Sequence, residues 1–475
     1  MSATLLALLH ELDPSLRIAI FERLESLAQE SSQAMNNAWT WHSWLCELNY
    51  TPQKEDGSID VSKAIHIAES FALSKQFRAY LTKKQYFKKP QDFIHAIPHC
   101  SFVSWSDNVK YLKKRYAALK HNPIFKSMQY SEDPKVLQQW MPLIMKWRNT
   151  KIPCAATYIS TGTDIDFGKL SQSIFQHATQ KWNVHLFLHN QVTTIKRIDN
   201  NRQEISVVDI KSWRKKKINT SFVFIGAGWA ALPLLQKSWV PQAKWFGGFP
   251  VSGQRLVCDN KDIIQDHHAK VYGLTEVWSP PMSVPHLDTR IIAGKKQLLF
   301  GPYAWFTTKF LKQWSLWDLF LSIRPNNIIP MLQAWRRNIW LTKYLIKQAL
   351  QSQSDRMKAL RVYFPNAKEQ DRRLVEAGNR VQIIKKSKEW WILQFWTELV
   401  VSDDGSVAAL LWASPWASTA VSIMIELLEK CFSQQMQAWW KEKISNMIPS
   451  YNTSNNTIGH EKIQQEVDSI LWLID

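Results

Sequence analysis

Tryptophan outnumbers glycine in this chain and stands at places where a folded backbone usually needs glycine. The 475 residues include 25 Trp and only 14 Gly, whereas a frequency of about 7% would give roughly 33 Gly in a chain of this length. Trp213 separates two β-rich runs, and Trp390 and Trp391 stand where Gly-Gly would make a tight turn. Such turns favour Gly because they use positive φ angles. The fold must therefore hold bulky indoles in its tight loops, or glycine stands there instead.

Two explanations fit this pattern. In the first, the indoles are real and fill loops that cannot easily take them. In the second, some codons translated here as Trp are read as Gly by the organism. We favour the second, because a Gly codon such as GGA differs from UGA by a single base. A reassigned UGA would produce this one type of substitution, whereas ordinary decay would scatter many.

Length and composition indicate a globular protein of two or three subdomains, since 45% of the 475 residues are hydrophobic. The net charge of +19 favours anionic partners such as a membrane surface. Basic residues are spread along the chain, and their longest cluster is only 214–217. Because no nucleic-acid-binding motif accompanies them, we predict a lysine-rich surface and no nucleic-acid partner.

Cysteine and hydropathy patterns favour a cytoplasmic protein. The five cysteines are widely separated and form no CxxC pair, which argues for a reducing compartment and against structural zinc. Adjacent His267 and His268 cannot both face one pocket in a regular element, so we predict no metal site. No run reaches the roughly 18 apolar residues of a spanning helix, and the N-terminus lacks the basic flank of a signal peptide. Any membrane attachment should therefore be peripheral.

The first 23 residues read as the second half of a dinucleotide-binding βαβ unit. Residues 3–12 form an amphipathic pattern, and an apolar run at 17–21 ends in Glu22. In such a unit an acidic residue at this place binds the ribose hydroxyls, and a strand with a Gly-rich loop precedes the helix. We expect the chain to begin one strand late, without that loop. Gly226 and Gly228 follow the apolar run 222–225 like a strand-to-helix nucleotide loop interrupted by Trp229.

Several longer motifs resemble the malate:quinone oxidoreductase family. They are 247–253 (GGFPVSG), 267–273 (HHAKVYG), 280–290 (PPMSVPHLDTR), 299–302 (LFGP) and 308–312 (TKFLK). The segments 47–52 (ELNYTP), 162–164 (GTD), 381–386 (VQIIKK) and 417–423 (ASTAVSI) belong to the same pattern. The resemblance covers almost the whole chain and is highly specific.

The resemblance implies an α/β fold similar to the FAD-dependent amino-acid and hydroxy-acid oxidases. A discontinuous Rossmann-like FAD-binding domain would be interleaved with a substrate domain built on an antiparallel sheet. We assign the FAD-binding domain to 1–60, 155–235 and 375–432, the substrate domain to 61–154 and 236–374, and a C-terminal tail with short helices to 433–475. The chain departs from the family pattern where members typically carry Gly, at Trp39, Trp41, Trp147, Trp229, Trp239, Trp245, Trp278, Trp314, Trp396, Trp412 and Trp416.

The family is implied to oxidise (S)-malate to oxaloacetate and to pass the electrons through FAD to a membrane quinone. Malate carries two carboxylates and a hydroxyl, so its site needs cations and a base. We assign Arg290 to a carboxylate, Lys309 as a second cation and His286 as the base. His286 is equally consistent with a purely hydrogen-bonding role, and His42 is the rival base.

FAD binding is assigned to residues from several parts of the chain. The loop 413–418 precedes a helix whose N-terminus could stabilise negative charge on a reduced flavin, although Ser418 is also consistent with a plain N-cap. The predicted cofactor residues are Glu22, Arg23, Ser43, Gly226, Gly228, Gly301, Ser414, Pro415, Ala417 and Ser418.

The expected partners are malate, quinone and the anionic inner face of a bacterial cytoplasmic membrane. Two alternatives stay open. One is another FAD-dependent 2-hydroxy-acid oxidoreductase, such as a 2-hydroxyglutarate oxidase. The other is a decayed chain that binds no flavin and is inactive.

Overall fold

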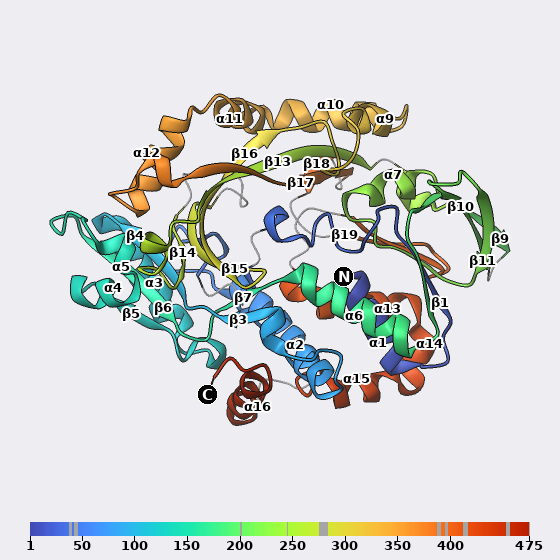
Figure 1. Cartoon of the computed structure of the whole chain (residues 1–475), viewed down its shortest axis with the longest axis horizontal. Helices are drawn as coiled ribbons and strands as arrows, with labels where there is room; N and C mark the ends of the chain where they lie inside the picture. Colours follow the sequence, from blue (N-terminus) through green and yellow to red (C-terminus); the bar gives the residue numbers. More distant parts are fainter. Residues whose placement is uncertain are drawn as a thin grey trace.

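The computed structural model describes residues 1–37, 40–41, 46–199, 202–244, 246–274, 284–386, 391–394, 398–411, 417–452 and 457–474. Helices lie on opposite sides of a large curved sheet (Figure 1). Helices α9 (Asp318–Ser322), α10 (Ile328–Arg337), α11 (Ile339–Ala349) and α12 (Gln353–Tyr363) follow one side. A second group of helices and smaller sheets lies across the molecule from them. The mixed α/β class predicted from the sequence is confirmed.

Among the described residues, nine strands make up the large sheet. Their order is β18 (Trp391–Gln394), β17 (Arg373–Lys386), β13 (Gly247–Cys258), β16 (Lys295–Phe306), β15 (His286–Ile292), β14 (Lys270–Tyr272), β4 (His99–Ser104), β6 (Cys154–Ile159) and β5 (Gln129–Ser131). All described neighbours are antiparallel except β14 and β4. Helices α3 (Ser106–Leu119), α4 (Pro134–Trp140), α5 (Pro142–Met145) and α8 (Lys261–Ile264) pack on this sheet.

A two-residue turn sets the register of the central hairpin. Ala293 and Gly294 join β15 to β16 with φ angles of 49° and 75°, as a type I′ turn requires. The pairing that follows places His286 directly opposite Gly301. Residues 286–290, the described strand part of the family-like motif 280–290, are thus held in the middle of the sheet.

Parallel strands lie on the other side of the molecule, as the dinucleotide-binding pattern predicts. Strand β1 (Ile18–Phe21) pairs with β8 (Val184–Phe187), and β12 (Val223–Ile225) pairs with β20 (Val407–Leu411), which also contacts β19 (Glu398–Val401). Helices α1 (Ser2–Leu12), α6 (Phe167–Lys181) and α13 (Ala420–Cys431) contribute to one apolar core with α2 (Ser62–Lys83). The helices and strands expected around Glu22, Gly226 and Ser418 are therefore present.

The remaining strands form two small sheets. Strands β9 (Asn190–Asp199), β10 (Arg202–Asp209) and β11 (Lys215–Thr220) make an antiparallel sheet packed beside α7 (Ala231–Gln236). Strands β2 (Thr40–Trp41), β7 (Thr163–Ile165) and β3 (Ile94–Ala96) make the other. The hairpin expected around Trp213 is the β10–β11 pair.

The elements do not follow the sequence boundaries that we assigned to the two domains. Helix α2 lies in our substrate segment 61–154 but packs with α1 and α13. Strands β6 and β17 lie almost wholly in our FAD segments but belong to the nine-stranded sheet. The final residues pack as well: α14 (Ser433–Gln435), a π-helical turn (Met436–Trp440), α15 (Lys441–Met447) and α16 (Thr457–Ile470) follow one another. Lys75 of α2 forms a buried ion pair with Asp468 of α16.

Tryptophan is concentrated at backbone positions that suit glycine. Nine non-glycine residues of the described chain have positive φ angles, and four of them are Trp105 (78°), Trp147 (70°), Trp213 (58°) and Trp472 (57°). Only 25 of the 475 residues are Trp, so this share is far above its frequency. A bulky L-residue is strained here by about 1–2 kcal/mol, because Cβ crowds the next carbonyl. These four side chains are 58–75% exposed, so little packing offsets the strain.

Other indoles pack as core residues. Trp182 stacks on His10 with ring centroids 3.7 Å apart, and Trp140 stacks on Tyr158 at 5.0 Å. Trp440 is 2% exposed within the helical core. These packed tryptophans therefore differ from the four strained ones. Trp39, Trp245, Trp278, Trp396, Trp412 and Trp416 lie outside the described residues.

Candidate active site

A cavity of about 1290 Å³ connects the parallel strands to the large sheet. Its walls include all of β1 and β12, the N-terminus of α1, and Tyr272, His286 and Pro302 of the large sheet. Typical small-molecule pockets measure about 300–1,000 Å³. The cavity therefore has room for a dinucleotide-sized group together with a small substrate.

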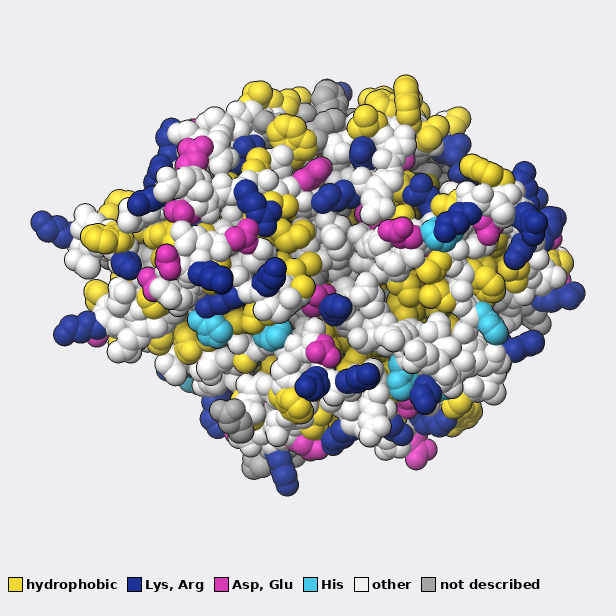
Figure 2. Space-filling model, in the orientation of Figure 1, with side chains coloured by type: hydrophobic (Ala, Val, Ile, Leu, Met, Phe, Trp, Pro, Cys, Tyr) yellow, Lys and Arg dark blue, Asp and Glu magenta, His cyan; other side chains and the backbone are white. Residues whose placement is uncertain are grey.

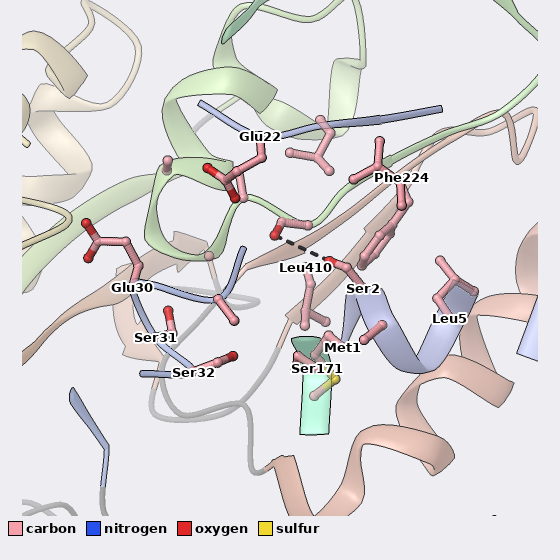
Figure 3. Close-up of a pocket in the computed structure, with 18 of the residues that line it drawn as sticks. Met1, Ser2, Leu5, Glu22, Glu30, Ser31, Ser32, Ser171, Phe224 and Leu410 are labelled. Atoms are coloured by element: carbon pink, nitrogen blue, oxygen red, sulfur yellow. Dashed lines mark hydrogen bonds between the residues drawn. The ribbon is translucent and has the colours of Figure 1, made fainter. Parts of the chain in front are cut away.

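Glu22 stands at the cavity end of β1, as the ribose-binding prediction requires. Its backbone continues the β1–β8 pairing, because its N–H donates to the carbonyl of Phe187 at 2.9 Å. Its carboxylate accepts from the N–H of Leu24 at 2.9 Å and points into the cavity (Figure 3). Burial raises the pKa of Glu22. A buried carboxylate of this kind gains from added hydrogen-bond donors such as hydroxyls.

Gly226 and Gly228 form a tight loop after β12 that lines the same end of the cavity. A Cβ atom at Gly226 would lie 2.1 Å from the hydroxyl of Ser2, and Gly228 has a φ of +56°. The Ser2 hydroxyl donates to the carbonyl of Gly226 at 3.5 Å, drawn as a dashed line in Figure 3. The loop and the N-terminus of α1 thus approach closely, and both positions suit glycine alone.

Three further predicted cofactor residues line this cavity. The guanidinium of Arg23 lies 5.5 Å from the ring centroid of Trp314. Ala417 and Ser418 lie in the turn before α13. Thr419, and not Ser418, occupies the N-cap position of α13. Ser418 is thus a cavity residue rather than the plain cap that we considered as an alternative.

His286 lies at the end of the cavity that the large sheet forms, and it contacts Asp288. Both belong to β15, two residues apart and so on one face. The Nδ1 of His286 is 2.8 Å from the Oδ2 of Asp288, and its ring stacks on Tyr272 with centroids 4.6 Å apart. Burial alone would raise the pKa of Asp288, but His286, Lys270 and Arg290 outweigh it and hold it at about 2. Asp288 therefore stays a carboxylate. A neutral His286 that donates through Nδ1 presents Nε2 as a base.

Arg290 is placed differently from our prediction. It is fully buried, its Nε lies 2.7 Å from Asp164, and it does not line the cavity. Lys270 shares the same carboxylate at 2.7 Å, and the N–H of Ile291 donates to its other oxygen at 2.9 Å. Arg290 thus neutralises Asp164 beneath the cavity, and its side chain is not among those that line the cavity.

Arg255 of β13 is the buried cation that does line the cavity, and sequence reasoning missed it. Its Nη1 donates to the carbonyl of Asn37 at 2.5 Å, and the Nη1 of Arg290 approaches that oxygen at 3.4 Å. Both guanidinium groups therefore meet at Asn37. The one signal in the sequence is a charged residue next to an apolar run, 256–258, in a strand-like segment.

The other predicted residues lie apart from the cavity or outside the described chain. The side chain of Lys309 is half-buried and does not line the cavity, while its carbonyl accepts from Asn379 at 3.2 Å. Gly301 sits opposite His286, and its neighbour Pro302 forms the wall. His42, Ser43, Ser414 and Pro415 lie outside the described residues.

The described ranges contain neither a metal-binding cluster nor a membrane-spanning helix. No cluster of three or more His, Cys, Asp or Glu side chains there has the arrangement of a metal site. No helix of the described chain is long and apolar enough to cross a membrane.

Comparison with solved structures shows the fold of flavin-dependent oxidases. The chain is similar to the L-α-glycerophosphate oxidase of Mycoplasma pneumoniae, solved with FAD bound, with a TM-score of 0.56 and 15% identity over 90% of this chain and 91% of that one. The glycine oxidase of Geobacillus kaustophilus gives a TM-score of 0.55 and 11% identity, covering 91% of each chain. The predicted fold class is therefore confirmed.

Sequence comparison identifies the family. The family model for malate:quinone oxidoreductase matches residues 1–473. A probable malate:quinone oxidoreductase of Flavobacterium johnsoniae is 51% identical over 96% of this chain and 92% of its own. A probable member from Bacillus cytotoxicus is 51% identical over 98% of this chain and 93% of its own. The chain therefore belongs to the malate:quinone oxidoreductase family.

Proposed function

We propose that this chain oxidises (S)-malate to oxaloacetate with FAD and delivers the electrons to a membrane quinone. The observation that carries the proposal is the His286–Asp288 pair, held 2.8 Å apart at one end of a cavity whose other end carries Glu22 and the loop 226–228. A base and a dinucleotide-binding end therefore share one cavity, in a chain that belongs to this family. We also propose that the protein acts peripherally on the inner face of the cytoplasmic membrane.

The cavity residues fit FAD. Glu22 would accept hydrogen bonds from the ribose hydroxyls, because its half-buried carboxylate reaches the cavity. Gly226 and Gly228 would let the backbone approach the pyrophosphate, and the α13 N-terminus beside Ser418 would favour negative charge on the flavin. Bound FAD would supply an acceptor for the hydride that leaves C2 of malate.

The protein's own residues then bind malate and move its hydroxyl proton. Arg255 would hold a carboxylate of malate, with Arg290 behind it and attached to the same Asn37 carbonyl. His286 would take the hydroxyl proton on Nε2 as the C2–H bond breaks. Asp288 would stabilise the imidazolium that results, because it stays ionised 2.8 Å from Nδ1.

Turnover with two acids and a soluble quinone analogue tests the proposal. Malate should be oxidised faster than 2-hydroxyglutarate, and the purified protein should show the absorbance of an oxidised flavin. Faster oxidation of 2-hydroxyglutarate would identify that longer acid, and not malate, as the substrate. A protein that retains no flavin absorbance after incubation with FAD and removal of the unbound cofactor would instead support the decayed, inactive chain.

Removing the charge of Arg255 is expected to weaken malate binding. The Arg255→Met variant should raise the KM for malate by about 10–100-fold, because a hydrogen bond to a charged group is worth about 1.5–3 kcal/mol. Steady-state kinetics with the FAD-loaded protein would measure it. Arg356→Met is the matched control, since Arg356 is also buried but does not line the cavity. An unchanged KM in Arg255→Met would contradict the assignment.

Glu22 is expected to make FAD binding depend on pH. Because burial raises the pKa of Glu22, acidification should protonate this carboxylate before exposed ones and weaken FAD binding. Glu22→Gln should raise the Kd for FAD by about 10–100-fold at neutral pH and abolish that pH dependence. Flavin fluorescence titration measures both effects. Glu25→Gln, at an exposed position three residues later, should behave as the parent protein.

A further inference from the structure

Half of the large exposed hydrophobic side chains of the described residues lie in one short segment. Of 22 such side chains, 11 fall between residues 316 and 350, around α9, α10 and α11. Examples are Leu316, Phe320, Leu321, Ile329, Leu332 and Leu350, all more than 50% exposed. We call this surface the α9–α11 face. It runs along the outer side of the large sheet in Figure 1, where Figure 2 shows hydrophobic side chains gathered along the edge.

The helices of this face are apolar on both sides. Their inner sides are already packed, because Ala334 of α10 and Leu345 of α11 form a core cluster with Val251 of β13 and Ile384 of β17. Their outer sides have no such cover among the described residues, and they carry Leu332, Ile346 and further exposed apolar groups. Soluble monomers rarely expose apolar surface on this scale, which marks a site of contact.

The charges around the face favour an anionic partner. Residues 309–350 contain seven Lys and Arg and a single acid, Asp318, which is buried. On α11, Lys343 and Lys347 are exposed on the same side as Ile346 and Leu350. Apolar side chains interleaved with long cations match the boundary between lipid headgroups and acyl chains, where the cations reach the headgroups.

The same charges disfavour a second copy of this chain. A two-fold dimer through this face would bring the cationic face of one copy against the same face of the other. The cations concerned are Lys343, Lys347, Arg336 and Arg337. No exposed acid lies between residues 309 and 350, and Asp355, which borders Lys343 and Lys347, already pairs with Lys358 at 3.3 Å. An anionic bilayer meets both the apolar and the positive requirement.

The face also adjoins the active-site cavity. Leu311 and Trp314 line the cavity, and the chain reaches exposed Leu316 two residues later. The N–H groups of Lys312 and Gln313 donate to the carboxylate of the cavity residue Glu30 at 3.1 and 3.0 Å, which ties this segment to the cavity wall. A lipid-soluble molecule arriving at the face would therefore be close to the cavity.

We infer that the α9–α11 face docks on an anionic lipid bilayer and thereby brings the cavity to the lipid-soluble quinone. The docking itself follows from the exposed face, and only its link to quinone rests on the proposed function. The two parts are therefore tested separately.

Flotation with lipid vesicles tests the docking. The protein should float with vesicles that contain phosphatidylglycerol and bind less to phosphatidylcholine alone. The triple variant Leu321→Ser/Ile329→Ser/Leu332→Ser should bind about tenfold more weakly or worse. The Lys343→Gln/Lys347→Gln variant should bind vesicles that contain phosphatidylglycerol about fivefold more weakly per lysine, and its binding to phosphatidylcholine alone should not change. Val362→Ser/Leu374→Ser is the matched control, because these exposed apolar residues lie elsewhere and should not affect binding.

The outcomes separate the alternatives. Unchanged vesicle binding by the triple serine variant would overturn the inference. A parent protein that ignores vesicles but becomes monomeric only in the triple variant would instead assign the face to a second copy. Malate turnover with a water-soluble acceptor should survive the triple substitution, while turnover with a bilayer-embedded quinone should fall. If malate is not oxidised with either acceptor although flotation depends on the face, the proposed function fails and the docking stands.

Discussion

Replacing His286 with Gln is expected to lower the kcat for malate oxidation by about 10²–10⁴-fold, which is the usual contribution of a positioned general base. His286 lines the cavity, and its Nδ1 is fixed by Asp288 at 2.8 Å, so that Nε2 is the atom presented to substrate. Gln keeps a hydrogen-bonding side chain of similar size but cannot accept the proton. The loss should therefore appear in kcat, measured with the FAD-loaded protein and a soluble acceptor.

Controls distinguish a base from a structural residue. His268→Gln alters an exposed histidine near the same sheet and should leave kcat unchanged. Flavin content and Kd for FAD should be normal in His286→Gln, because the dinucleotide end of the cavity is built by other residues. A His286→Gln variant with nearly full kcat would show that His286 only donates hydrogen bonds, and would return His42 as the candidate base.

Asp288 acts through His286 and its loss should be visible in the pH profile. Asp288 is held at a pKa of about 2 after burial is outweighed by His286, Lys270 and Arg290. Because this pKa lies below the ordinary value of about 3.9 for an aspartate, Asp288 contributes stability above about pH 4, which is lost as the pH falls towards 2. In Asp288→Asn the imidazolium loses its partner, so the acid limb of the kcat profile should move to lower pH. A merely structural role would leave that limb in place.

Four of the predicted cofactor residues line one cavity, and the signals that singled them out are local. Glu22, Gly226, Gly228 and Ser418 stand at strand ends or helix starts, where short-range patterns are informative, and the structure brings them to one cavity. The hairpin around Trp213 follows from alternating strands in the same way. These features depend on residues that are close together in the chain, and they can therefore be predicted from local sequence patterns.

The substrate end could not be predicted as fully, because it depends on contacts between distant segments. We expected Arg290 to bind a substrate carboxylate because a guanidinium can form a bidentate pair with it. Alternation along β15 does place Arg290 on the same face as His286 and Asp288. The structure inserts Asp164 from β7 beneath the end of the strand, and this carboxylate engages Arg290 at 2.7 Å. Arg255 reaches the cavity from β13 instead. No pattern within β15 encodes a partner 126 residues away.

Our domain bounds stay a prediction, but several elements pack across them, and chain order did not indicate this. Helix α2 was assigned by its position in the chain, but its apolar face is covered by α1, α13 and the C-terminal helices. Lys75 of α2 is buried only because Asp468 reaches it from α16. Which surface covers a helix is decided by tertiary packing, and chain order alone does not reveal it.

Glycine is expected at positions 105, 147, 213 and 472 when peptides of the protein from its native organism are analysed by mass spectrometry. The structure gives these residues φ angles between 57° and 78°, a region that Gly enters without strain and Trp does not. Trp182 and Trp440, by contrast, are packed into the helical core and its aromatic contacts and should be found as Trp. Trp at all four positive-φ positions would refute the reassigned codon.

Stability of the protein made from the printed sequence tests the same idea independently. Changing Trp105, Trp147, Trp213 and Trp472 to Gly should raise the free energy of unfolding by about 1 kcal/mol per position, because each substitution relieves a left-handed backbone. Their side chains are 58–75% exposed, so little packing is lost. Trp440→Gly is the matched control and should lower the free energy of unfolding by about 3–5 kcal/mol, as expected for a large buried aromatic. A gain in stability at the four exposed positions would show that their backbone is built for glycine, because Gly at an ordinary position lowers stability through its greater freedom in the unfolded chain.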